Sequence, residues 1–242
     1  MEGPANLYGV DARSSFEPMV KLRYLGHSAF TIFDGNRTVI IDPFLSGNSE
    51  AQFKALDIEA DLILVTHAHS DHLGDAIDMS KRSNSPILCS FELGMYCESQ
   101  GAKVINAHIG GKFKFDFGSV KLFPALHSSS LDDVHPLGTA ISFMVNMGGK
   151  NLYHAGDTAL FGDMALISEQ YHIDAAMLPI GGVYTMDSED AVRAEKLLRA
   201  KKVIPMHYGK WSEADPYEFR DRIAEQAIGA ALVMRPGDAI IV

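Results

Sequence analysis

Three histidines and one aspartate stand within six positions of this chain, in the run HAHSDH at positions 67–72. Imidazole nitrogens and carboxylate oxygens are ligands that divalent transition metals take in proteins. In extended backbone, side chains two positions apart point to the same side, so His67 and His69 can bind one ion. Asp71 and His72 follow a turn of the chain and can hold a second ion. The run predicts a two-metal hydrolytic site.

Two other interpretations of the run are weaker. A lone histidine is usually a surface or structural residue, but that explanation does not account for four ligands in six positions. A structural zinc site usually recruits thiolates, and neither Cys89 nor Cys97 lies near the run. The C-x7-C spacing of these two cysteines also matches no metal or redox motif. We therefore interpret the run as a catalytic metal site.

Composition excludes several classes of protein. A chain of 242 residues with 47% apolar content fits a globular protein of one or two domains. The formal net charge is -10 and no basic stripe is present, which argues against a long nucleic-acid groove. Residues 1–18 have neither an apolar core nor a cleavage-like site. We expect them to form an N-terminal extension before a single domain at 19–242, without a membrane anchor and in the cytoplasm.

Short β-rich runs dominate the first half of the chain, and strands alternate with helices in the second. Strands are expected at 20–25, 29–33, 38–41, 62–66, 86–90, 104–106, 113–117, 120–125, 140–146, 151–153, 175–179, 203–206, 231–234 and 239–242. Helices are expected at 75–81, 91–99, 160–170, 187–200 and 216–227. This order favours two sheets packed face to face with helices outside them.

Three later segments share one layout, in which an apolar strand is followed by a strong metal ligand and a turn. The ligands in these segments are His127, Asp157 and His207. His135 is an alternative to His127, which we favour because it ends a strand. His154 lies three residues before Asp157, so in extended backbone it points to the opposite face and we expect a structural role for it.

With these segments the chain resembles the metallo-β-lactamase superfamily from about Gly26 to Gly209. The resemblance implies an α+β fold, a four-layer αββα sandwich of two mixed β-sheets with helices outside and the site at one edge. It also implies a ligand set, with His67, His69 and His127 on the first metal, Asp71, His72 and His207 on the second, and Asp157 bridging both. Gly156 lacks a Cβ atom, and we expect this to let the backbone approach the ions.

Shorter motifs narrow the resemblance to one branch. The sequences LGHSAF at 25–30, YHAGDT at 153–158 and PMHYG at 205–209 are similar to those of small cytoplasmic metal-dependent hydrolases related to ascorbate-6-phosphate lactonase and N-acylphosphatidylethanolamine phospholipase. A histidine at position 69, where a carboxylate would favour an oxygen-reducing di-iron site, argues against that chemistry. Many members of this branch have threonine where this chain has Lys210-Trp211.

The expected cofactors are two divalent metal ions, with zinc favoured and manganese or iron also suited to these ligands. Ions about 3.5–4 Å apart would share a hydroxide that attacks a small carbonyl or phosphoryl substrate. We expect a lactonase or esterase. The alternative is a phosphodiesterase acting on a cyclic nucleotide, short nucleic acid or phospholipid head group, which would require cations around the pocket. The candidate cations are Lys81, Arg82, Arg193 and Lys210. A non-enzymatic metal-binding domain is a third interpretation, but it predicts missing ligands.

Beyond the ligands, we expect catalytic roles for Asp71 as a proton shuttle and for His27 as a polar contact to the substrate or leaving group. A surface histidine in a hairpin turn is the alternative for His27. The expected substrate contacts are His27, Gly182, Tyr184, Tyr208 and Trp211. The loop at 181–186 precedes a helix and can bind an anion there, or it can simply cap the helix. A small molecule is the expected partner, and a homo-oligomer is left open.

Overall fold

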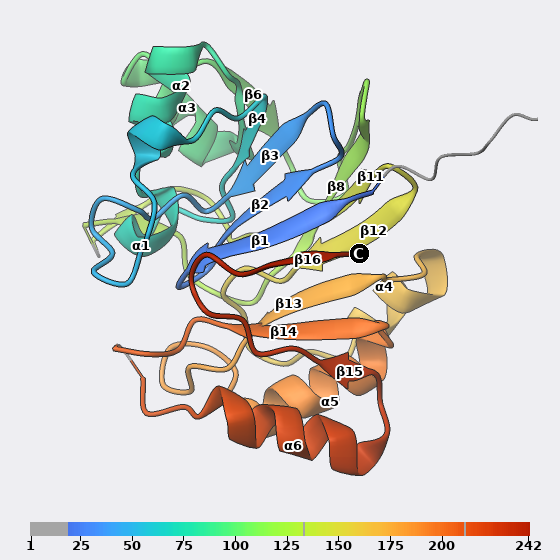
Figure 1. Ribbon diagram of the computed structural model, residues 1–242. Coiled ribbons are helices and arrows are strands. Elements are labelled where there is room, and N and C mark those ends of the chain that lie inside the picture. The colour runs from blue at the N-terminus through green and yellow to red at the C-terminus, as the bar shows by residue number, and fades with distance from the viewer. Residues whose placement is uncertain (1–18, 133, 211) are drawn as a thin grey trace, which may run out of the picture.

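The computed structural model describes residues 19–132, 134–210 and 212–242 (Figure 1). The expected N-terminal extension at 1–18 and Trp211 lie outside the described residues. One sheet has the strand order β16-β1-β2-β3-β4-β5-β6. Its strands are β1 (Lys21–Gly26), β2 (Ala29–Phe33), β3 (Thr38–Ile41), β4 (Leu62–Leu64), β5 (Ile87–Ser90), β6 (Val104–Ala107) and β16 (Ala239–Ile241).

The second large sheet has the order β15-β14-β13-β12-β11-β8-β7. Its strands are β7 (Lys112–Phe115), β8 (Gly118–Pro124), β11 (Ile141–Met147), β12 (Lys150–His154), β13 (Ala175–Pro179), β14 (Lys202–Met206) and β15 (Ala230–Ala231). Two short strands, β9 (Ser130–Leu131) and β10 (His135–Pro136), form a separate hairpin.

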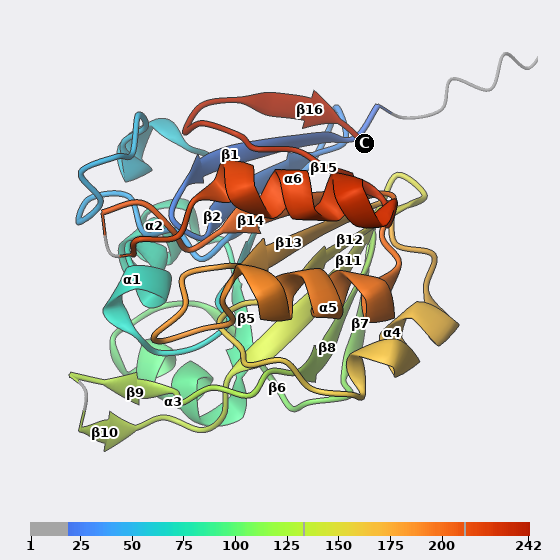
Figure 2. The same ribbon diagram turned by 90° about the horizontal axis from the view of Figure 1, so that it is seen from below.

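Helices cover the outer faces of both large sheets (Figures 1 and 2). They are η1 (Ala55–Asp57), α1 (Ser70–Leu73), α2 (Ala76–Ser83), α3 (Phe91–Ser99), α4 (Met164–Gln170), α5 (Ser188–Leu198) and α6 (Pro216–Gln226). Helices α2 and α3 lie beside the first sheet, and α5 and α6 beside the second. These four layers confirm the predicted αββα sandwich. Among the described residues, no helix has the length and apolarity needed to cross a membrane.

The core explains why most strands read as continuous apolar runs. Strands buried on both faces need apolar side chains at every position. Within β3, Val39 and Ile41 point into the large cluster between the sheets, whereas Ile40 points into a second cluster with α2 and α3. Phe30 of the first sheet and Phe143 of the second are both fully buried in the large cluster. The packing of this large cluster determines how the two sheets lie against each other.

Strand direction brings several loops to one edge of the sandwich. β1, β3 and β4 run in the same direction, because β1–β2 and β2–β3 are antiparallel pairs and β3–β4 is parallel. In the second sheet β8, β12 and β14 share one direction for the same kind of reason. The carboxyl ends of such strands are where α/β proteins build their sites. Loops after these six strands carry the residues discussed below.

A few element boundaries differ from the predicted ones. The strand expected at 62–66 ends at Leu64, because the Thr66 amide donates to the Asp42 carboxylate at 2.8 Å instead of continuing the ladder. The helix expected at 160–170 begins only at Met164, and the last but one strand has two residues. Helix α1 and the β9–β10 hairpin were not predicted.

Glu195 on α5 provides a test of the core that is independent of the site. The side chain is 1% exposed, and burial raises its carboxyl pKa from 4.5 to about 9. The folded protein therefore keeps a proton between these pH values that the unfolded chain releases, so stability falls as pH rises through this window.

The variant Glu195→Gln has no proton to lose. As the pH rises from 5 to 8, the unfolding free energy of the variant relative to that of the wild type should therefore increase by up to about 1.4 kcal/mol per pH unit. Urea unfolding of both proteins across this range measures the difference. Exposed Glu98→Gln is the control and should show a constant difference. A constant difference for Glu195→Gln as well would contradict the prediction.

Candidate metal centre

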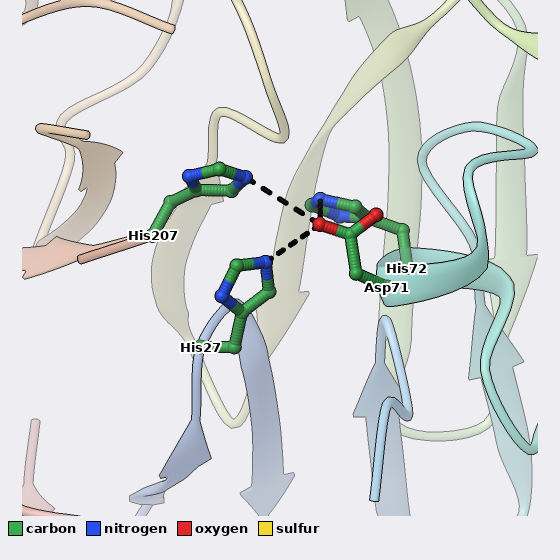
Figure 3. A group of neighbouring side chains, drawn as sticks. All are labelled: His27, Asp71, His72 and His207. Atoms are coloured by element: carbon green, nitrogen blue, oxygen red, sulfur yellow. Dashed lines mark hydrogen bonds and ion pairs between the residues drawn. The ribbon is translucent and has the colours of Figure 1, made fainter. Parts of the chain in front are cut away.

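The seven predicted ligands come together at the edge where the two sheets meet. His67 and His69 lie in the loop after β4, Asp71 and His72 on α1, His127 after β8, Asp157 after β12 and His207 directly after β14. Figure 3 shows His27, Asp71, His72 and His207 converging on one point from the β1–β2 turn, helix α1 and the end of β14. Each residue follows the carboxyl end of a strand or lies on the short helix after one.

Three imidazole nitrogens form the first donor set. His67 Nε2 lies 3.0 Å from His69 Nδ1, and His127 Nε2 lies 3.3 Å from the same atom. Ligand atoms bound at about 2.0–2.1 Å to one tetrahedral ion are about 3.3 Å apart. The spacing of these nitrogens therefore fits one ion held by all three side chains.

A second donor set lies beside the first, with Asp157 between them. Asp71 Oδ2 is 3.8 Å from His72 Nε2 and 3.7 Å from His207 Nε2. Asp157 Oδ2 is 3.2 Å from His72 Nε2 and 2.9 Å from His207 Nε2. The same oxygen is 3.8 Å from His127 Nε2, which belongs to the first set. One carboxylate oxygen thus faces donors of both sets.

Asp42, which sequence reasoning missed, fixes the proton positions of two ligands. Its Oδ2 accepts from Thr66 Oγ1 at 2.7 Å and from His72 Nδ1 at 2.8 Å. Because the Thr66 hydroxyl gives its proton to Asp42, its oxygen accepts from His67 Nδ1 at 2.9 Å. Both rings therefore carry a proton on Nδ1 and, when neutral, present a lone pair at Nε2.

This arrangement supplies a direct test of whether the residues fit a metal. His72 Nε2 and Asp157 Oδ2 are both lone-pair atoms when His72 is neutral, yet they lie 3.2 Å apart in a buried site. Two facing lone pairs repel, and their desolvation has a cost unless a donor or cation satisfies them. A proton on His72 Nε2 satisfies both, and so does a metal ion between them. Burial lowers the pKa of His72, but the Asp157 and Asp42 carboxylates outweigh it and raise the pKa well above its ordinary value, so this position attracts positive charge. The donor set therefore fits a divalent ion.

The charges of the site follow from burial and from the carboxylates. Burial lowers the pKa of His67 and of His127. Burial acts in the same direction on His207, but the Asp157 carboxylate outweighs it and raises the pKa to about 9. Burial opposes ionisation of Asp71, yet its contacts with His207 and His27 hold the carboxyl pKa well below its ordinary value. His67 and His127 are thus neutral, whereas His207 and Asp71 form an ion pair.

His27 is buried against the second donor set. It is 2% exposed, and its Nε2 lies 2.9 Å from Asp71 Oδ2. Its carbonyl oxygen accepts from the Tyr24 hydroxyl and from the His207 amide, both at 3.0 Å. These contacts exclude the alternative of a surface histidine, because they hold the β1–β2 turn against the ligand loop after β14.

Two other histidines lie outside the cluster. His135 is exposed on β10. His154 is fully buried, and its ring nitrogens contact the Ser28 carbonyl at 2.9 Å and the Gly156 amide at 3.1 Å. At Gly156 φ is +62°, and a Cβ atom there would lie 3.0 Å from the Thr66 side chain, so the missing side chain makes room for Thr66.

Of the expected substrate contacts, His27 lies within the cluster, whereas Gly182, Tyr184 and Tyr208 belong to neither donor set. Tyr184 is 73% exposed in the loop that also contains Gly182. The Tyr208 hydroxyl donates to the Met234 carbonyl at 3.2 Å. At the start of α5, Asp187 caps the helix by accepting from the Asp190 amide at 2.8 Å. This agrees with the alternative in which the segment before the helix serves to cap it. Gly182 lines a cavity of about 670 Å³.

That cavity lies between the loops after β13 and β14, next to the ligand His207. Gly181 lines it, and a Cβ atom at Gly181 would come within 2.5 Å of the His207 carbonyl oxygen. Its charged lining residues are Asp187, Glu189, Lys210, Glu213, Asp215, Glu218 and Arg222. Carboxylates outnumber cations there.

Asp42→Asn should weaken metal binding without altering the fold. Asparagine keeps the shape, but its amide group cannot accept from Thr66, His72 and the Thr66 amide together. Loss of such an outer partner typically costs about 10–100-fold in metal affinity. Chelator competition measures this loss. Asp61→Asn, on the sandwich surface, is the control, and wild-type affinity in Asp42→Asn would contradict the prediction.

Comparisons with known proteins agree with this geometry. The model of the beta-lactamase superfamily domain matches residues 21–207. A UPF0173 metal-dependent hydrolase from Thermus thermophilus is 46% identical, covering 92% of this chain and 99% of the relative. One from Thermococcus kodakarensis is 43% identical over 92% and 99%. The structure of Igni18, a metallo hydrolase from Ignicoccus hospitalis, superposes with a TM-score of 0.85 at 37% identity, covering 93% of this chain and 98% of that one.

These matches and the fold define a metallo hydrolase of the beta-lactamase type. The chain belongs to the beta-lactamase superfamily and, within it, to the UPF0173 metal-dependent hydrolases. The superfamily and the enzyme class that the sequence predicted are confirmed.

Proposed function

We propose that this protein is a binuclear metal-dependent hydrolase that cleaves a lactone or another small carboxylic ester. The observation that carries the proposal is the position of Asp157. Its Oδ2 is 2.9 Å from His207 Nε2 and 3.8 Å from His127 Nε2, so one oxygen can serve an ion in each donor set. A shared carboxylate is what a two-metal site needs to hold its ions at a short separation.

Two divalent ions, of which zinc suits this nitrogen-rich set best, would lower the pKa of a shared water and polarise the substrate oxygen. The protein's own contribution is to fix the ligands and to control access. Asp71 is the accessible ligand of the second set, with a side chain that is 35% exposed. We assign Asp71 the role of accepting the proton from the attacking water.

His27 is the polar group next to Asp71, with 2.9 Å between His27 Nε2 and Asp71 Oδ2. In the proposed reaction it holds the Asp71 carboxylate in place and contacts the leaving group. Substrate extends from the ligands toward the cavity that Gly182 lines. Tyr184 and Tyr208 remain proposed substrate contacts.

Charge around the site favours an ester over a phosphodiester. A diester requires Arg or Lys side chains to bind its negative charge. Arg82 instead donates to the carbonyls of Ala55 and Ile58, and Arg193 pairs with Glu189. Lys210 lines a cavity in which carboxylates predominate. This surrounding supports a neutral carbonyl substrate.

A paired substrate test distinguishes the two reactions. Protein purified without chelator and loaded with zinc is assayed on a panel of simple lactones, on p-nitrophenyl acetate and on bis-p-nitrophenyl phosphate. We expect turnover of the carbonyl substrates to exceed that of the diester. His127→Ala should lose this activity, whereas His135→Ala should keep it, because His135 is exposed and outside the cluster.

Diester turnover that exceeds lactone and ester turnover would replace the proposal with the phosphodiesterase alternative. Full activity in His127→Ala would contradict the ligand assignment. Manganese-loaded and iron-loaded protein, assayed in parallel, shows which metal gives the highest kcat/KM.

A further inference from the structure

Three consecutive serines follow the ligand His127, and they divide their contacts between two sides. The Oγ atoms of Ser128 and Ser130 lie 3.4 Å and 3.3 Å from His69 Nε2. Ser129 points the other way, accepting from the Ala68 amide at 3.1 Å and donating to the Leu137 carbonyl at 3.1 Å. In extended backbone alternate side chains share a side, so this spacing presents the two outer hydroxyls together.

His69 needs an acceptor at the nitrogen that these hydroxyls face. Its Nδ1 belongs to the first donor set, at 3.0 Å from His67 Nε2 and 3.3 Å from His127 Nε2. A neutral imidazole that presents a lone pair at Nδ1 carries its proton on Nε2. Within the described part of the chain, the side-chain atoms within hydrogen-bonding distance of His69 Nε2 are the two serine hydroxyls.

We propose that Ser128 and Ser130 are positioning residues that accept the Nε2 proton of His69 and thereby present its Nδ1 lone pair to the first metal. The inference rests on the proposed function, since it takes His69 to be a metal ligand. These contacts also connect two loops of the first donor set, because the loop that contains His127 holds the ring of His69, which lies in the loop after β4.

This anchoring differs from that of His67 and His72. His72 donates directly to the buried Asp42 carboxylate at 2.8 Å, and hydrogen bonds to charged acceptors are about twice as strong as neutral ones. His67 donates at 2.9 Å to the buried Thr66 hydroxyl, which Asp42 holds in turn. His69 instead faces two hydroxyls at 3.4 Å and 3.3 Å, of which Ser128 is exposed. The contacts of His69 are therefore longer and more accessible than that of His67.

The presence of two hydroxyls for one proton gives the proposal a distinctive signature. Both contacts, at 3.4 Å and 3.3 Å, are longer than the usual range of about 2.7–3.2 Å for N–H···O hydrogen bonds, as expected for a shared proton. Either serine can take over when the other is removed. Ser128→Ala and Ser130→Ala alone should each change zinc affinity by less than about threefold, whereas the double variant should lose about tenfold, the lower end for outer ligand partners.

The experiment measures zinc affinity by chelator competition, the electronic spectrum of cobalt-substituted protein, and the melting temperature of the metal-free protein. Its variants are Ser128→Ala, Ser130→Ala, the double variant, and Ser128→Ala combined with Ser130→Thr. Threonine restores one hydroxyl and is the conservative rescue. Ser99→Ala is the control, because its hydroxyl lies on an exposed helix end and, within the described residues, hydrogen-bonds with the Tyr96 carbonyl and the Gln100 side chain.

We expect the double variant to bind the more tightly held of the two zinc ions about tenfold more weakly than the wild type does. The electronic spectrum of its cobalt-substituted form should shift, and the melting temperature of its metal-free form should stay unchanged. The threonine rescue should restore both readouts. A double variant with wild-type affinity and spectrum overturns the inference, as does a threonine variant that rescues neither. The substrate panel tests the proposed function separately. If the zinc-loaded wild-type protein hydrolyses none of the substrates, the proposed function is wrong, whereas the effect of the serines on zinc binding is unaffected.

Discussion

Dialysis against a strong chelator should abolish hydrolysis, and added zinc should restore it to a plateau at two equivalents per chain. The reason is the pair of donor sets that share Asp157, whose Oδ2 is 3.2 Å from His72 Nε2 and 3.8 Å from His127 Nε2. If only one ion is bound, it serves one donor set, and the ligand atoms of the other set have no cation beside them. Activity measured against metal content over the titration gives the stoichiometry.

The same titration should raise the melting temperature, because ions that bind only the folded protein stabilise it. At free zinc 100 times the dissociation constant the gain is about 2.7 kcal/mol per site. Magnesium is the control, since it prefers oxygen ligands and octahedral geometry. Full activity at one equivalent, without further change at two, would contradict the binuclear proposal.

Asp157→Asn should reduce kcat/KM by at least about 10²–10³-fold, the loss typical of removing one charged or donor group that acts in the transition state. Asp157 is 2% exposed, and asparagine has nearly the same shape, so the fold should be retained. The amide removes the charge that faces His72 and His207. We expect metal content to fall from two ions toward one.

Elemental analysis and steady-state kinetics of the same Asp157→Asn preparation check both parts of this prediction. Asp163→Asn is the matched control, because Asp163 is exposed before α4 and makes no capping hydrogen bond with its side chain. An Asp157→Asn protein with two ions and wild-type kinetics would show that another group joins the two donor sets.

Three of the predicted ligand rings contact partners of two kinds. A buried carboxylate, Asp42, acts on His67 through Thr66 and on His72 directly. Serine hydroxyls face His69. A charged acceptor makes the lone pair at the opposite nitrogen of His72 more basic. Because Asp42 supports one histidine in each donor set, substitutions at Asp42 should have larger effects than substitutions at the serine pair.

The sequence by itself predicted the candidate metal ligands and the class of the fold. The HAHSDH run, Asp157 and His207 follow apolar strands, and that local pattern predicts metal ligands at strand ends wherever the strands lie. The alternation of apolar runs with helical segments favoured two sheets with helices outside, and the family resemblance implied the four-layer sandwich. These properties are local, because residue type, spacing and periodicity specify them within a few positions.

Only the tertiary structure decided which distant residues serve those ligands. Asp42 directly follows the strand Thr38–Ile41, in the same layout as the predicted ligands, so the rule that singled out His207 could also have singled out Asp42. Its role, however, depends on contact with His72, 30 residues away. His27 meets Asp71 across 44 residues, and Ser130 meets His69 across 61.

Such contacts are set by strand order and by the packing of the core between the sheets, and no local pattern records them. The same packing explains Gly156, whose missing side chain makes room for Thr66 of the neighbouring sheet. The sequence specifies the groups that do chemistry through their types and spacing. Which groups hold them depends on where the strand ends meet, since that is a property of the whole sandwich.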